Sequence, residues 1–116
     1  MNTQLFEVHL RVHLTPDHPK FGKFGFALLV VWLYASDHKS ALEKAVVWIR
    51  PLPYEIGDVK SFAITEQPNL KAYQIEGVKK AEIIGRNLAL FHWPKGTDES
   101  QVLGSWPGLV PILNLP

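Results

Sequence analysis

Four polar side chains at alternate positions near the N-terminus are of types that can catalyse reactions or bind ligands. They are Glu7, His9, Arg11 and His13. Histidine and glutamate are common general acids and bases, and arginine binds anions. The residues that alternate with them are apolar: Phe6, Val8, Leu10, Val12 and Leu14. This period of two predicts a β-strand with one buried and one solvated face. The polar face is the candidate ligand-binding or catalytic surface, and an exposed row without function is the alternative.

The same spacing argues against a metal site on this strand. His9 and His13 share a face, but four strand residues span about 13 Å, which is too far for two imidazoles to share one ion. The chain contains no cysteine, so disulfides, thiolate catalysis and Cys-based zinc sites are excluded. We therefore predict no bound metal and no cofactor.

Two other segments carry chemistry-bearing residues without a recognisable motif. Asp37 and His38 could form an acid–base pair, although an N-cap aspartate followed by an exposed first-turn histidine explains them equally well. The stretch FGKFGF, residues 21–26, resembles a phosphate-binding loop only in its glycines. It precedes a strand and no helix follows it, so a hairpin loop is expected there.

Composition restricts the class of partner. The 116 residues include 12 basic and 11 acidic side chains scattered along the chain, a balance that argues against binding of nucleic acid or an anionic membrane by charge. The longest apolar run, Phe26–Ala35, has ten residues, about half the length that spans a bilayer as a helix. We expect a cytoplasmic protein that forms one domain over residues 1–116.

Hydrophobic periodicity predicts the elements. After the first strand, Thr15–Gly25 reads as a long connection, and Phe26–Ala35 reads as a central strand because it is apolar on both faces. A helix follows the Ser36-Asp37 cap and is stopped by Pro51 and Pro53. Its core side is predicted to consist of Ala41, Leu42, Ala45, Val46 and Ile49. The later segments are predicted as strands over Val59–Glu66 and Leu70–Ile75 and a helix over Val78–Phe91.

These elements predict a single α+β domain with the order ββαββα. We expect an antiparallel sheet of about four strands, two helices packed mainly on one face, and an extended apolar C-terminal tail. Gly85 lies inside the second predicted helix, where we expect it to permit close approach to a neighbouring element.

The tail, Gln101–Pro116, points to association. It has no charged side chain, eight large apolar side chains and three prolines, so it requires a covering surface on its own domain or on a second copy. Together with two loop phenylalanines it supplies the predicted interface residues Trp106, Leu109, Val110, Ile112, Leu113, Phe21 and Phe24. We expect a small interaction or regulatory protein that forms a homodimer or larger homo-oligomer. The alternative is a small-molecule binder or enzyme that uses the polar face of the first strand.

Truncation tests the importance of the tail. Deletion after Glu99 should cause aggregation or dissociation, because burial of several hundred Å² at about 25 cal/mol per Å² outweighs what a solvated segment would gain. Light scattering and thermal melting of the truncated and complete chains measure both effects. A truncated chain that stays soluble, equally stable and in the same oligomeric state would show that the tail is dispensable.

Overall fold

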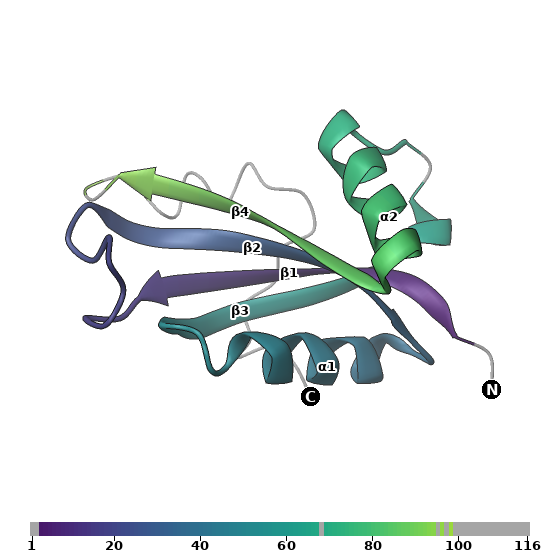
Figure 1. Cartoon of the computed structure of the whole chain (residues 1–116), viewed down its shortest axis with the longest axis horizontal. Coiled ribbons are helices and arrows are strands. Elements are labelled where there is room, and N and C mark those ends of the chain that lie inside the picture. Colours follow the sequence, from purple (N-terminus) through teal and green to yellow (C-terminus); the bar gives the residue numbers. More distant parts are fainter. Residues whose placement is uncertain (1–2, 68, 95, 97, 99–116) are drawn as a thin grey trace.

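Four antiparallel strands form one sheet in the order β3-β1-β2-β4 in the computed structural model of the chain (Figure 1). The elements are β1 (Gln4–Leu14), β2 (Phe24–Ala35), α1 (His38–Ile49), β3 (Tyr54–Ala63), a 3-10 turn (Ile64–Glu66), α2 (Ala72–Ile84) and β4 (Arg86–Pro94). The structure describes residues 3–67, 69–94, 96 and 98. The predicted tail, with its interface residues Trp106, Leu109, Val110, Ile112 and Leu113, lies outside the described residues. The predicted α+β class, the four-stranded antiparallel sheet and the two helices are confirmed.

The two inner strands follow the predicted patterns. The alternating strand β1 pairs along its length with β2, from Gln4 opposite Ala35 to His13 opposite Phe26. β2 lies between β1 and β4, and its apolar side chains are buried on both faces of the sheet. A strand that is covered on both sides needs apolar residues at consecutive positions, which is the composition of Phe26–Ala35.

Helix α1 also forms as predicted. The side chain of Asp37 accepts a hydrogen bond of 2.7 Å from the backbone amide of Ser40, and this satisfies one of the free amides of the first turn. Ala41, Ala45 and Ile49 are fully buried against the sheet. Leu42 and Val46 are partly buried and pack beside them.

The segment from residue 70 to residue 91 differs from the prediction. Most of Leu70–Ile75, predicted as a strand, belongs to α2, and Arg86–Phe91, predicted as helical, belongs to β4. Helix α2 buries Gln74, Gly77 and Ala81, whose spacing is helical but whose side chains are polar or small. A search for large apolar residues at helical spacing therefore places this helix too late in the chain, at Val78–Phe91 instead of Ala72–Ile84.

Gly85 ends α2 and does not make a close contact. Its φ of 101° lies in the left-handed region, and its amide donates to the carbonyl oxygen of Ala81 at 2.7 Å. This is the usual role of glycine at a helix C-terminus. A Cβ at this position would meet nothing within 4 Å, so the predicted close approach at Gly85 is wrong.

The two helices lie on opposite faces of the sheet, which corrects the prediction that both cover mainly one face (Figure 1). Helix α1 packs on the face that carries Phe6, Val8 and Leu10 of β1. Helix α2 packs on the other face, against Leu28, Val30 and Trp32 of β2. Because β2 is apolar on both faces, each helix covers one of its two sets of side chains.

Close approach of α2 to the sheet depends on Gly77. A Cβ on Gly77 would lie 2.4 Å from the six-membered ring of Trp32, a distance that real contacts do not reach. Trp32 is 1% exposed, so its ring has little room to move aside. The absence of a side chain at residue 77 is therefore what lets the helix lie on the indole.

Gly77→Ala should destabilise the protein by about 1–3 kcal/mol, because a methyl group would overlap a buried ring. Intrinsic helix propensity alone predicts the opposite sign, a gain of up to about 1 kcal/mol. Urea unfolding followed by tryptophan fluorescence measures the change. Glu76→Ala, at the exposed neighbouring position, is the matched control. A Gly77→Ala protein as stable as the control would show that α2 does not lie on Trp32.

Candidate functional site

The polar row of β1 lies on the α2 face of the sheet, and its members differ in burial and in the partners that they contact. Glu7 and His9 are buried, with 1% and 4% exposure, so the predicted solvated face is wrong for these two residues. Arg11 and His13 are partly exposed. Arg11 forms a salt bridge with Asp58 of β3, while Glu7 and His9 bond to each other. The four residues therefore do not converge on one open site.

The buried carboxylate of Glu7 accepts hydrogen bonds from three elements. The indole Nε1 of Trp32 in β2 donates to Oε1 at 2.9 Å. The amide Nε2 of Gln74 in α2 lies 3.0 Å from both carboxylate oxygens. His9 places Nε2 2.6 Å from Oε2. Neither Trp32 nor Gln74 was predicted to belong to a site, because neither belongs to a local motif with Glu7.

These contacts determine the charge of Glu7. Burial raises the pKa of the carboxyl group, but the hydrogen bond and charge of His9, with the bonds from Gln74 and Trp32, outweigh burial and lower the pKa below its ordinary value. Burial and the charge of Glu7 raise the pKa of the nearby Tyr73 phenol to about 12. The network thus holds an ionised carboxylate between the sheet and α2, where solvent has almost no access.

A cluster of rings lies at the opposite end of the sheet. His18 Nε2 is 3.0 Å from the hydroxyl of Tyr54, and Phe24 stacks on His92 with ring centroids 4.7 Å apart. Burial lowers the pKa of His92, and the charges of Lys20 and His18 lower it further. Of the two predicted loop phenylalanines, Phe24 thus packs on its own domain, whereas Phe21 is 54% exposed.

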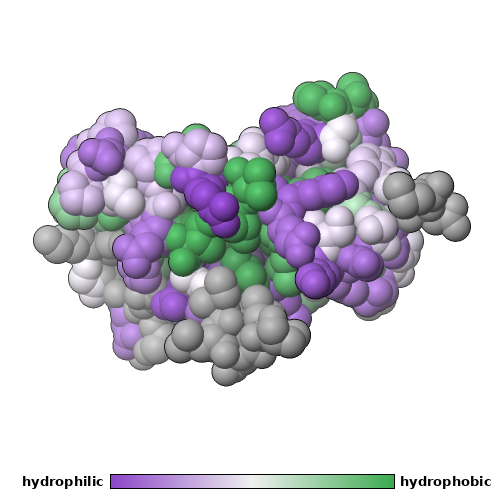
Figure 2. Space-filling view, turned by 90° about the horizontal axis from the view of Figure 1, so that it is seen from below, coloured by the Kyte–Doolittle hydropathy of each residue, from purple (hydrophilic) through white to green (hydrophobic). Residues whose placement is uncertain are grey.

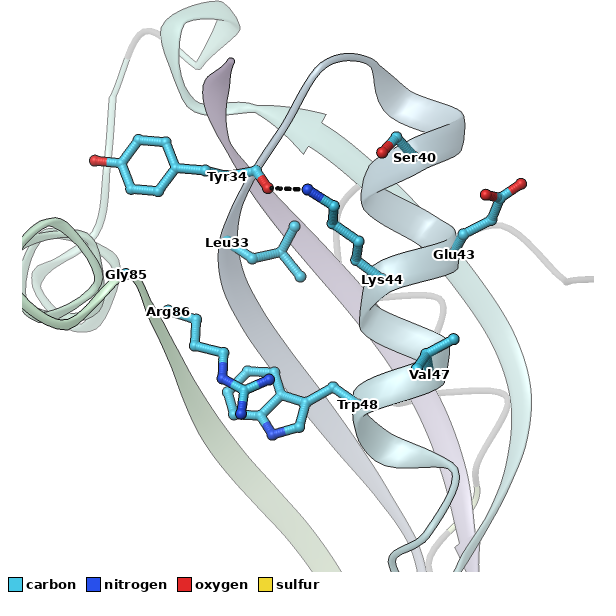
Figure 3. A pocket seen from close by; sticks show the side chains of 9 residues that line it. All are labelled: Leu33, Tyr34, Ser40, Glu43, Lys44, Val47, Trp48, Gly85 and Arg86. Carbon is cyan, nitrogen blue, oxygen red and sulfur yellow. Dashed lines mark hydrogen bonds between the residues drawn. The ribbon is translucent and has the colours of Figure 1, made fainter.

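The open surface of the α1 face is a groove between α1 and β4. It has a volume of about 580 Å³ and is bordered by the end of β2, the exposed side of α1 and the start of β4, as Figure 3 shows. Its lining residues are Leu33, Tyr34, Ser40, Glu43, Lys44, Val47, Trp48, Gly85 and Arg86. The guanidinium of Arg86 lies 4.0 Å from the centre of the Trp48 ring, a cation–π contact that joins β4 to α1.

Hydrophobic side chains are exposed around this groove. Seen from the α1 side, hydrophobic residues gather in the middle of the face between hydrophilic regions (Figure 2). Val47 of α1 is 63% exposed and Leu90 of β4 is 36% exposed. Large exposed apolar side chains that lie close together mark contact surfaces more often than isolated ones do. This groove with the adjoining strand β4 is the candidate functional site.

The described residues show no group of three or more histidine, aspartate or glutamate side chains placed to hold a metal ion. Within the same part of the chain, neither helix has the length and apolar composition needed to cross a membrane. Comparison of the chain with protein-family models, curated proteins and solved structures finds no match.

Glu7→Gln should destabilise the fold by about 2–4 kcal/mol, because the neutral amide would accept weaker hydrogen bonds than the buried carboxylate does. The effect should depend on pH. Since the folded pKa of Glu7 lies below the ordinary value of 4.5, the ionised carboxylate stabilises the fold above that pH, and the stabilisation is lost as pH falls through the lowered pKa.

Urea unfolding of both proteins between neutral pH and pH values below 4.5 measures this difference. The difference in unfolding free energy between the two proteins should be largest at neutral pH and should become smaller on acidification. Glu76→Gln, at a side chain that is 72% exposed, is the control and should follow the unmodified chain. A difference in unfolding free energy that does not change with pH would contradict an ionised Glu7.

Proposed function

We propose that this chain is a small interaction protein that works as a homo-oligomer, most simply a two-fold dimer joined along β4. The observation that carries the proposal is the contrast between the two outer strands of the described sheet. β4 has no Asp, Glu, Lys or Arg from Asn87 to Trp93. An outer strand presents unpaired backbone amides and carbonyls, and soluble proteins usually protect such edges with charges, prolines or bulges.

The other outer strand, β3, has that protection. It carries Glu55, Asp58 and Lys60 within ten residues. Its pairing with β1 also shifts register between Leu10 and Val12, an irregularity that disturbs the regular edge. A second chain therefore meets charges and an irregular backbone at β3, and meets neither over most of β4.

Side chains on both faces of β4 belong to hydrophobic clusters that a second chain could extend. Leu88 packs against the cluster beneath α1, and Ala89, Phe91 and Trp93 pack against the cluster beneath α2. Leu90 is the middle residue of Arg86–Pro94 and shares the α1 face with Leu88. If two copies pair β4 antiparallel about an axis near Leu90, the same surface meets itself, as a two-fold dimer requires.

The groove supplies side-chain contacts to this interface. Trp48 points from α1 toward β4 on the same face of the sheet as Leu90, so a second β4 would extend the apolar surface on that side of the helix (Figure 3). Arg86 is stacked on Trp48 at the start of the strand, so its charge lies away from the middle of the edge. Aromatic and arginine side chains are enriched among the residues that dominate binding energy.

The alternative function, a small-molecule binder or enzyme on the polar face of β1, has less support. Glu7 and His9 have almost no exposed surface and are hydrogen-bonded to each other, so they offer a ligand almost no accessible surface. Arg11, paired with Asp58, and His13 remain partly exposed on that face. The alternative would therefore depend on Arg11 and His13.

Leu90→Glu tests the dimer. A carboxylate at the centre of the paired strands would lie opposite its own copy, so the dimer dissociation constant should rise at least about tenfold. Sedimentation velocity or light scattering over a concentration series measures the mass against the 13.1 kDa of one chain. Leu90 is already 36% exposed, so the monomer should remain folded by circular dichroism.

Ile83→Glu is the matched control, because Ile83 is 84% exposed and lies on α2 away from the edge. It should leave the dimer intact. A complete chain that is monomeric at every concentration would overturn the proposal. A dimer that is equally stable with Leu90→Glu would show that the chain associates through another surface.

A further inference from the structure

A serine, a histidine and a glutamate from three consecutive elements meet at the end of the sheet where α1 begins. Ser61 Oγ of β3 lies 2.7 Å from His38 Nδ1, at the first position of α1. Glu66 Oε1, in the 3-10 turn after β3, lies 3.6 Å from His38 Nε2. From this geometry we propose that Ser61 is an activated nucleophile that accepts an acyl group from an ester, with His38 as its base and Glu66 as the group that positions the imidazole.

The fold brings these three residues together. Ser61 pairs with Val8 of β1, whose side chain is in the core beneath α1, so Ser61 also lies on the α1 face. Asp37 caps the helix and thereby fixes where its first residue, His38, begins. The imidazole packs edge-on against the buried ring of Phe6 with 5.0 Å between ring centroids. This contact restricts the orientation of the imidazole.

The carboxylate favours one tautomer of His38. A negative charge near Nε2 favours a proton on that nitrogen, and Nδ1 is then free to accept the hydroxyl proton of Ser61. A nucleophile bonded to a base that is oriented by a third group is the arrangement of serine hydrolases. Here the two ring nitrogens exchange roles relative to the common serine–histidine–aspartate triad, in which Nε2 receives the serine proton.

The reaction balances without a cofactor. Ser61 Oγ attacks the carbonyl carbon of an ester while His38 Nδ1 takes the hydroxyl proton, and the ester C–O bond breaks as the leaving alcohol receives that proton. Water then attacks the acyl-serine with His38 again as base, releasing a carboxylic acid and restoring Ser61. The site is open to such a substrate, since the side chains of His38 and Glu66 are 51% and 66% exposed.

This site is independent of the proposed dimer interface. Ser61 lies on β3, at the opposite edge of the sheet from β4. A small activated ester is the substrate class that suits an exposed site, because it requires little binding surface. The Ser61 hydroxyl is the group that should carry the acyl or phosphonyl adduct.

The experiment uses the complete chain with two probes, p-nitrophenyl acetate and an alkyl fluorophosphonate. Intact mass and peptide mapping should place one adduct on Ser61. Ser61→Ala should abolish that adduct, and His38→Gln should slow its formation about 100-fold, the usual contribution of a general base. Ser36→Ala is the matched control, since Ser36 is an exposed serine two residues before His38 and does not line the groove. It should retain the adduct.

A structural role for the Ser61–His38 hydrogen bond would not produce these results. The rate of adduct formation should fall on acidification, because a protonated imidazole cannot accept a proton. Glu66→Gln should slow the reaction while circular dichroism stays unchanged. Absence of an adduct at Ser61, an adduct only on His38 or on lysine, or labelling that is unaffected by His38→Gln would each overturn the proposal.

Discussion

The position of α2 depends on one buried carboxylate. An ionised group removed from water is costly unless it is fully hydrogen-bonded, and Glu7 meets this condition only when Trp32, Gln74 and His9 surround it. Gln74 therefore sets the rotation and the height of α2 above the sheet. At that height the helix contacts the indole of Trp32 three residues later, and residue 77 must be glycine. The polar contact and the small residue thus define one docking geometry together.

That geometry determines which surface remains open. Helix α2 covers its face at the end of the sheet near Glu7, and α1 covers the other face over β1, β2 and β3. β4 leaves α2 at Gly85 and runs along the outside of the sheet, with a groove between it and α1. Its apolar residues are thus partly buried by their own domain, and Leu90 is exposed.

Sequence periodicity predicts the elements whose large apolar side chains face the core. β1, β2 and α1 belong to this group, and their bounds agree closely with the prediction. It misplaces α2, whose buried residues are Gln74, Gly77 and Ala81, and it assigns most of β4 to that helix because the apolar run of β4 also fits a helical pattern. Periodicity also predicts that Glu7 is exposed to solvent, because the partners that stabilise its carboxylate lie 25 and 67 residues away in the chain. The expectation of a close approach at Gly85 is wrong, and the glycine that packs closely is Gly77, which the periodicity does not single out. The groove and the Ser61–His38 contact arise only from the assembled topology.

The outer strands explain why total hydrophobicity cannot locate the proposed interface. The chain is nearly balanced in charge, but its charges are distributed unequally between the two edges of the described sheet. β3 combines charged residues with a register shift, and both features disfavour pairing with a new strand. β4 carries its only charge at Arg86, where the guanidinium is already held over Trp48. Which strands are outermost follows from the order β3-β1-β2-β4, and only that order turns the uncharged sequence of β4 into a surface suited to pairing.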